Sequence, residues 1–286
     1  MSTPDADVVG PNTGNSVLGD AWVNFKRWNR KTVRNPTAFV LEIVVAVFSL
    51  LLFTAVFGDV GGFALERAGF AGVEYVTFLL PAVLLQATMG SAFTSGMGLV
   101  SDLESGMFEK VVVTPMTWTA VFAGKAASEL ARIVLQLLAV LGLGVLMGAD
   151  VTTGVPGVLG IVVVCLLVGL LFMSISNVIG LVTRDEEVLN AASMLFMFPL
   201  LFLSPAFIPM SSEVELIATF NPVTYAVDAV RAFVLGEDVM TVVTVSRFGG
   251  MYDTLVPAFA VLVGLNVVFG AITVSLLSRA SSAEAE

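Results

Sequence analysis

Five polar or ionisable side chains lie inside stretches that are otherwise apolar, and they are the residues of this sequence best suited to chemistry. Glu42 lies about a turn and a half inside the first apolar stretch. Lys125, Glu129, Arg132 and Gln136 follow one another at spacings of four, three and four, which places them on one face of a helix. They either pair within that helix, or Glu42 pairs across helices with Arg132. The sequence leaves both arrangements open.

A charged stretch separates the second long apolar segment from the third. It is longer than the roughly two to eight residues that a plain connection between antiparallel helices needs. We interpret it as a short helix on which a soluble partner docks, and a solvated loop is the simpler alternative. Its candidate contact residues are Asp102, Glu104, Gly106, Glu109, Lys110, Pro115, Gly124 and Lys125.

Other chemistries are excluded by what the sequence lacks. It has no histidine and one cysteine, Cys165, so zinc, haem and iron–sulfur sites built on nitrogen or thiolate ligands are not expected. Gly124-Lys125 is followed by Ala126 and does not complete a phosphate-binding loop, so the chain does not hydrolyse ATP by that route. The polar face around Arg132 stops near one end of its segment, which argues against a proton path or an ion filter.

The composition places the chain in a membrane. Of its 286 residues, 57% are hydrophobic and 13% are charged, and no soluble core requires so much apolar surface. A helix needs about 20 apolar residues to span a bilayer. Because the apolar segments are continuous, we expect an all-α membrane protein with six transmembrane helices. Their expected bounds are 37–57, 75–100, 118–147, 155–182, 188–209 and 255–278.

The remaining segments flank these spans within one transmembrane domain, 18–280. Residues 1–17 have the composition of a disordered tail, 18–34 form an amphipathic helix that suits the membrane interface, and 281–286 form a short tail. Ten of the 13 Lys and Arg residues lie on the side of the two termini. This bias predicts a multi-pass protein of the cell membrane with both termini in the cytoplasm.

A further apolar segment, 211–236, is expected not to cross the membrane. Pro222 follows Asn221 and blocks helix continuation, and Asp228 and Arg231 interrupt the rest. We expect a re-entrant or surface-lying helical segment on the outer face, covered by protein. Its motif residues are Asn221, Pro222, Tyr225, Asp228 and Arg231.

Two motifs of the sequence resemble the signatures of ABC-2 type transport permeases. The first comprises Glu104-Ser-Gly106, Glu109-Lys110, Thr114-Pro115 and Gly124-Lys125, and the second runs from Asn221-Pro222 through Tyr225 and Asp228 to Arg231. Met107-Phe108 departs from the threonine and hydrophobic pair that the family often has there. The resemblance covers nearly all of the chain beyond residue 17, and the subgroup resembles the daunorubicin-resistance and nodulation-type exporters.

The resemblance implies a transport component that is not itself an enzyme and binds no cofactor. Its partners would be a second permease subunit, identical or related, and two ATPase subunits that bind ATP and Mg²⁺. Membrane lipids surround such a subunit, and the net charge of −10 argues against nucleic acid. The pair would export an amphipathic drug, lipid or glycan-related substrate, with the charged stretch coupling it to the ATPase. A stand-alone channel or secondary transporter is the main alternative, and an intramembrane enzyme is a more distant one.

The fifth expected span carries candidate cargo contacts. By resemblance, the path lies between two subunits, lined by the first, second and fifth spans. Asn190 and Ser193 would give the fifth span a sparse polar side, while Met194, Met197 and Phe198 would offer adaptable apolar contact. Ordinary packing against the core or lipid explains each of these residues equally well.

Overall fold

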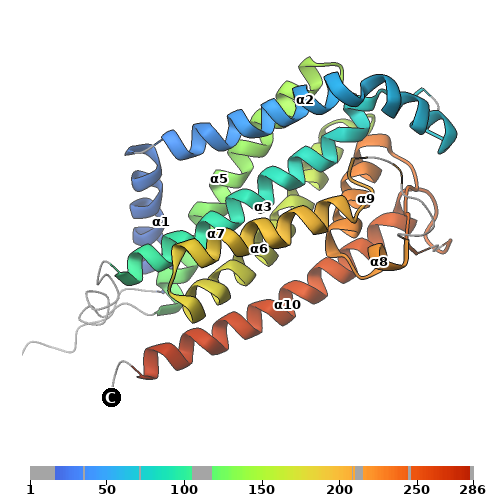
Figure 1. Cartoon of the computed structure of the whole chain (residues 1–286). Helices are drawn as coiled ribbons and strands as arrows, with labels where there is room; N and C mark the ends of the chain where they lie inside the picture. Colours follow the sequence, from blue (N-terminus) through green and yellow to red (C-terminus); the bar gives the residue numbers. More distant parts are fainter. Residues whose placement is uncertain are drawn as a thin grey trace, which may run out of the picture.

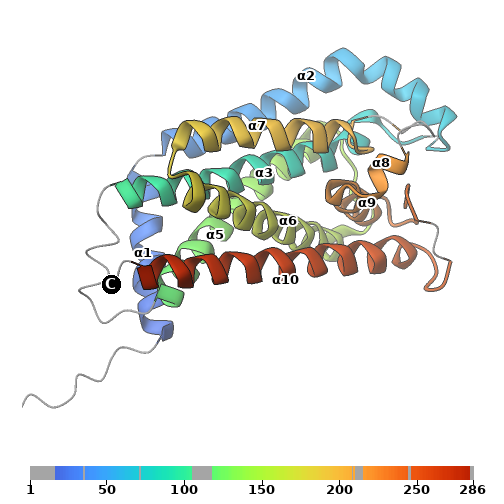
Figure 2. The ribbon, with the colours of Figure 1, turned by 60° about the horizontal axis from the view of Figure 1, so that its bottom comes forward.

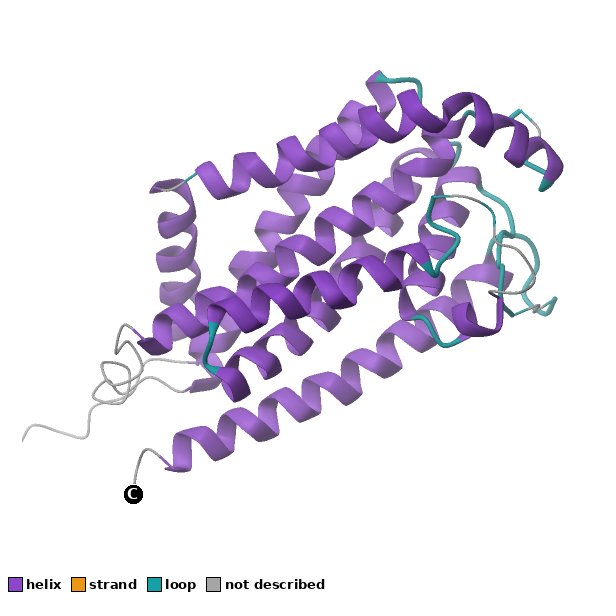
Figure 3. Ribbon diagram, in the orientation of Figure 1, coloured by secondary structure: helices purple, strands orange, loops and turns teal. Residues whose placement is uncertain are grey.

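The computed structural model describes residues 17–34, 36–70, 72–104, 118–207, 209, 215–243 and 246–283, and these ranges contain helices and no strand (Figure 3). The long helices run along the bundle (Figure 1): α2 (Thr37–Arg67), α3 (Tyr75–Glu104), α5 (Trp118–Leu146), α6 (Gly154–Thr183), α7 (Glu186–Phe202) and α10 (Tyr252–Ala283). α1 (Val17–Arg34) stands crosswise at the end that holds the C-terminus, here called the terminal end. α8 (Glu215–Thr219) and α9 (Pro222–Leu235) lie at the opposite, far end. The expected all-helical fold is confirmed.

Five of the long helices have the length and apolar composition needed to cross a membrane. They are Phe39–Arg67, Tyr75–Asp102, Ala123–Leu146, Gly154–Thr183 and Tyr252–Leu276. The segment expected as the fifth span, 188–209, overlaps α7, which has 17 residues, begins at Glu186 and ends at Phe202. At about 1.5 Å per residue α7 is roughly 25 Å long, somewhat less than the ~30 Å of a bilayer's hydrocarbon core. The count of six spans therefore depends on α7 together with the turn that follows it.

α3 lies at the centre of the bundle and is almost entirely buried, because α2, α5, α6, α7 and α9 all pack against it. Its closest approach is to α6. A Cβ atom at Gly96 would lie 2.1 Å from Ser176 Oγ, and one at Gly180 would lie 3.3 Å from the Gly96 carbonyl oxygen. Ser176 Oγ donates a hydrogen bond to the Phe93 carbonyl at 2.8 Å. Small residues thus let the two backbones approach closely, as is common between membrane helices.

α2 and α10 lie on opposite sides of the bundle, and both leave most of their length uncovered. In Figure 2, α7 and α2 run along one side of α3, and α10 runs beyond α6. The uncovered faces carry large apolar side chains, for example Phe48 and Val60 on α2 and Val267 and Val274 on α10. Faces of this kind suit contact with lipid or with another subunit and not with water.

α9 is short and enclosed, in contrast to the long peripheral helices. It has 14 residues, and 11 of them are buried against α3, α6, α7 and α10. At roughly 21 Å it is too short to cross a bilayer. Asn221 caps its first turn, and Gly236 ends it in a left-handed conformation with φ 74°, which glycine adopts without strain.

Candidate functional site

Lys125 lies inside the protein at the terminal end, although the sequence places it in the charged stretch. Its side chain is 4% exposed. Its Nζ donates a hydrogen bond to the Ser95 carbonyl of α3 and lies 5.1 Å from the centre of the Trp28 ring of α1. A lysine so placed joins α5 to α3 and α1 through a charge-assisted hydrogen bond and a cation–π contact. It does not offer its charge at the surface.

α1 is also joined directly to α5 and α3. At Gly124, a Cβ atom would lie 2.4 Å from the Ala21 carbonyl oxygen, so only glycine allows α1 to lie this close to α5. Arg27 of α1 and Asp102 of α3 form an ion pair at 3.3 Å. α1 is therefore attached to both helices that border the charged stretch.

The charged stretch itself falls mainly outside the described residues. Gly106, Glu109, Lys110 and Pro115 all belong to that part of the chain. Glu104 is the last residue of α3 and is exposed at the terminal end. At the border of the charged stretch, Glu104 is therefore an exposed carboxylate. It lies at the same end of the bundle as the contacts that hold α1, α3 and α5 together.

A second cluster lies deeper in the bundle, where Arg132 contacts two carboxylates. Its Nη2 is 2.9 Å from Glu129 Oε2 on the same helix, and its Nη1 is 3.4 Å from Glu42 Oε1 on α2. Both arrangements that the sequence left open therefore occur together. Nη2 also donates to the Ser91 carbonyl at 3.0 Å, and Thr94 Oγ1 donates to Glu42 at 3.3 Å.

The Arg132 cluster is incompletely hydrogen-bonded within the part of the chain that the structure describes. Buried atoms that lack a protein partner are Glu42 Oε2, Ser91 Oγ, Ser95 Oγ, Arg132 Nε and Gln136 Oε1. A buried polar atom without a partner costs about 1–3 kcal/mol. The two carboxylates and one guanidinium of the cluster tie α2, α3 and α5 together. Because buried charges are costly and some of these atoms lack partners, the cluster adds less stability than a fully hydrogen-bonded one would.

At the far end, Asn221 connects the end of α7 to the start of α9. Its Nδ2 donates to the Leu200 and Leu203 carbonyls at 2.6 and 3.1 Å, and its Oδ1 accepts from the Val223 amide at 2.9 Å. One side chain therefore satisfies carbonyls at a helix C-terminus and an amide at a helix N-terminus. Pro222 occupies the first position of α9, where its missing N–H costs nothing, and Tyr225 donates to the Thr219 carbonyl at 2.8 Å.

Asp228 and Arg231 form a buried pair one helical turn apart on α9, 3.8 Å between Oδ1 and Nη1. Asp228 Oδ2 accepts two hydrogen bonds from Thr241, at 2.9 and 2.7 Å. Arg231 Nη2 donates to the Pro205 carbonyl at 2.8 Å, and the guanidinium lies 3.7 Å from the centre of the Phe78 ring. Burial raises the pKa of Asp228 to about 6 and lowers the pKa of Arg231 to about 10.

The candidate cargo residues lie along α7 at its uncovered side. Asn190, Met194 and Phe198 are exposed and follow at spacings of four, so they form one stripe. Met197 is half-buried, and Ser193 Oγ donates to the Asn190 carbonyl of its own helix at 2.7 Å. Neither polar group meets another helix through a described hydrogen bond, so the stripe is free to contact something outside the subunit.

The sequence patterns do not identify every residue that contributes to these sites. Trp28 is one that they miss, and the structure buries it against Gly98 and Lys125. Ser95 and Thr241 carry no sequence signal, because one acts through its backbone carbonyl and the other lies in a loop. Among the described residues, no three acidic or cysteine side chains gather as metal ligands would.

These features together define a class: a multi-pass helical membrane protein with charged side chains clustered inside the bundle. The chain belongs to the ABC-2 type transporter family, whose model matches residues 20–235. It is 28% identical over 244 residues to the daunorubicin resistance ABC transporter permease protein DrrB1 of Streptomyces coeruleorubidus, covering 84% of this chain and 80% of that protein.

Two of its other relatives share one name. The chain is 25% identical over 220 residues to the putative transport permease ycf38 of Cyanophora paradoxa, covering 75% of this chain and 73% of that one. It is 23% identical over 254 residues to the protein of the same name from Porphyra purpurea, covering 86% and 84%. Both carry the name of a transport permease, as DrrB1 carries the name of a transporter permease.

Proposed function

We propose that this chain is the permease subunit of an ATP-driven exporter in the cell membrane, with both termini in the cytoplasm. The spans are α2, α3, α5, α6, α7 and α10, and α7 crosses together with the turn after it. α1 lies in the cytoplasmic interface, and α8 and α9 form the outer re-entrant segment. Family membership supports the transport role, and the excess of Lys and Arg at the terminal end supports the orientation.

The energy for transport comes from two separate ATPase subunits, which bind ATP and Mg²⁺ and dock at the stretch between α3 and α5. The attachment of α1 to both flanking helices is the observation that carries this proposal. The Arg27–Asp102 ion pair and the contacts of Lys125 make α1, α3 and α5 move as one unit. A displacement at the docking stretch therefore reaches the centre of the bundle through α3.

The cargo is an amphipathic drug, lipid or glycan-related compound, and it passes between two permease subunits. The name of DrrB1 refers to resistance to daunorubicin, which favours a drug-like cargo for a permease of this kind. The uncovered stripe of α7 and the uncovered face of α2 supply apolar surface for both the second subunit and the cargo.

Reconstitution tests this function against the alternative of a stand-alone channel or secondary transporter. The chain is purified with the ATPase that accompanies it and placed in proteoliposomes with amphipathic fluorescent probes. We expect probe movement only with the ATPase and hydrolysable ATP. Flux through the chain alone, driven by an ion or proton gradient, would contradict the proposal.

The docking stretch is tested by Glu104→Lys, which reverses the exposed charge at the end of α3. We expect transport to fall while membrane insertion is retained, because mispaired charge weakens a protein interface. Glu66→Lys makes the same charge change near the far end of α2 and serves as the control. Normal transport and normal ATPase binding by the Glu104 variant would remove this residue from the docking site.

A further inference from the structure

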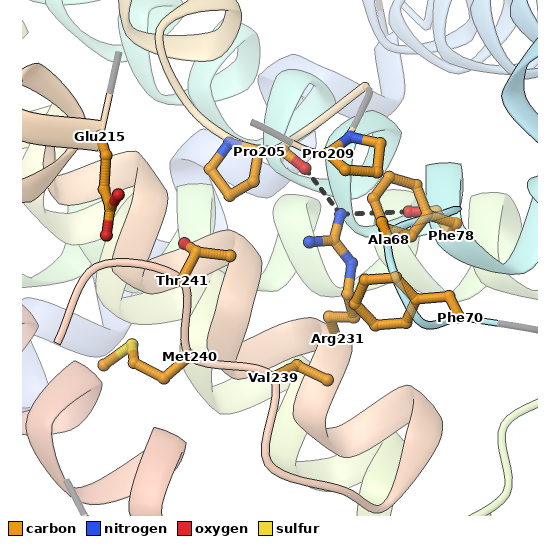
Figure 4. Close-up of a pocket in the computed structure, with 10 residues that line it drawn as sticks. All are labelled: Ala68, Phe70, Phe78, Pro205, Pro209, Glu215, Arg231, Val239, Met240 and Thr241. Carbon is orange, nitrogen blue, oxygen red and sulfur yellow. Dashed lines mark hydrogen bonds between the residues drawn. The ribbon is translucent and has the colours of Figure 1, made fainter. Parts of the chain in front are cut away.

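A pocket of about 410 Å³ opens at the far end of the bundle, and the transport role proposed above does not use it. It lies beside the end of α2 and the start of α3, and the turn after α7, α8, α9 and the loop after α9 complete its wall. Most of the lining is apolar, including Phe70, Phe78 and Met240. Among the described residues of the lining, the charged side chains are Arg231 and Glu215 (Figure 4).

Arg231 presents a donor in this wall that the protein does not satisfy. The side chain is 1% exposed, and its Nη2 donates to the Pro205 and Phe78 carbonyls. Nη1 makes no hydrogen bond to a described residue; it lies 3.8 Å from Asp228 Oδ1 and points toward the side of the pocket where Thr241 lies (Figure 4). The hydrogen bonds of Arg231 to the protein therefore occupy Nη2 but leave Nη1 without an acceptor, and a ligand oxygen in the pocket would supply one.

The charges around the pocket decide which ligand suits it. Asp228 lies 3.8 Å from Arg231 and already balances its charge. Glu215, the first residue of α8, is exposed and lies across the pocket from Arg231 (Figure 4). A plain anion would meet a cation that is already balanced and a second carboxylate. A zwitterion, with an anionic group toward Arg231 and an ammonium toward Glu215, complements both sides.

We propose that this pocket binds the phosphoethanolamine headgroup of a phospholipid. A phosphate oxygen accepts a hydrogen bond from Arg231 Nη1, and the primary ammonium donates to the Glu215 carboxylate. The position favours a lipid as the source, because the pocket adjoins the end of α2 and the start of α3, where the headgroups of a bilayer lie. Its volume is in the range of small-molecule sites.

Lipid retention tests the proposal. The full chain is placed in nanodiscs with equal parts of phosphatidylethanolamine, phosphatidylcholine and phosphatidylglycerol, and the lipids that remain bound are measured by native mass spectrometry. We expect phosphatidylethanolamine to exceed the other two by roughly tenfold, the effect of one charge-assisted hydrogen bond. The choline group has no N–H to donate, and phosphatidylglycerol has no cation. Equal retention of the three lipids would overturn the proposal.

Two variants locate the binding in this pocket without altering Arg231. Glu215→Gln removes the partner of the ammonium and should abolish the preference over phosphatidylcholine, while Met240→Trp fills the pocket and should lower retention of all three lipids. Glu237→Gln removes an exposed carboxylate that does not line the pocket and should change nothing. An unchanged preference in both pocket variants would refute the site. Free phosphoethanolamine should compete only weakly, and competition as strong as that of the intact lipid would exclude the lipid as the source.

Discussion

Arg132 lies between carboxylates from two different helices, and this position makes it sensitive to substitution. Arg132→Met keeps the apolar stem but leaves Glu42 and Glu129 without their cation. We expect the free energy of unfolding to fall by about 3 kcal/mol, as when one partner of a buried ion pair is removed. Thermal unfolding in detergent measures this loss.

A double variant separates charge from packing at the same cluster. Combining Arg132→Met with Glu42→Gln leaves one buried carboxylate in place of two, so part of the stability should return. Arg30→Met removes an exposed cation of α1 and serves as the control. If the single Arg132 variant melts at the temperature of the wild type, the cluster contributes nothing to the fold.

At the residue scale, sequence spacing predicts contacts within a helix better than contacts between helices. The spacing of Glu129 and Arg132 places them on one face whatever the tertiary fold. The contact of Arg132 with Glu42 depends on how α2 and α5 rotate against each other, which no local pattern encodes. The type of residue also misleads: Lys125 suggests a surface charge, but its environment is set by Trp28 and by a carbonyl of α3.

At the scale of the elements, the contact of α1 with α5 depends on a single glycine. Gly124→Ala would place a methyl group 2.4 Å from the Ala21 carbonyl oxygen, so α1 must shift. We expect a loss of about 2 kcal/mol and weaker coupling of ATP hydrolysis to transport. Gly142→Ala on the same helix meets nothing within 4 Å and is the matched control. Equal stability of the two variants would show that α1 is not held at this point.

The sequence predicts where the long helices lie but not how they meet. Continuous apolar runs indicate α2, α3, α5, α6 and α10, because lipid requires such runs whatever the helices pack against. The sequence does not show which of the 26 glycines lie where two helices approach closely. Gly96 and Gly124 lie at such contacts, while a Cβ atom at Gly90 or Gly142 would meet nothing within 4 Å. The end of α7 is likewise set by Asn221, a residue 19 positions beyond Phe202.

For the molecule as a whole, the orientation can be tested by labelling. In a Cys165→Ala background, single cysteines replace Glu215, Glu237 and Glu104, all of which are exposed. We expect an impermeant thiol reagent to label the first two from outside and Glu104→Cys only from the cytoplasmic side. Labelling of Glu215→Cys and Glu237→Cys from opposite sides would mean that α9 crosses the membrane.

The assembly of two subunits can be tested along α7. Cysteines at Met194 and Phe198 lie on its uncovered stripe, whereas Leu189 is buried against α3 and provides the control. We expect crosslinks between subunits from the first two positions, with loss of transport, and none from Leu189→Cys. Protein that transports but forms no crosslink at either exposed position would exclude α7 from the subunit interface.

The central place of α3 also has a consequence for the order in which the chain is made. α3 is the least apolar of the five helices that satisfy the span criteria, and its polar side chains Thr88, Ser91 and Ser95 are covered only when α5 and α6 pack against it. Ribosomes deliver those helices later. During synthesis, the polar side of α3 therefore stays uncovered until α5 and α6 have been made, and it faces the insertion machinery or lipid in the meantime. Biogenesis of the subunit is most vulnerable in that interval, before α6 emerges.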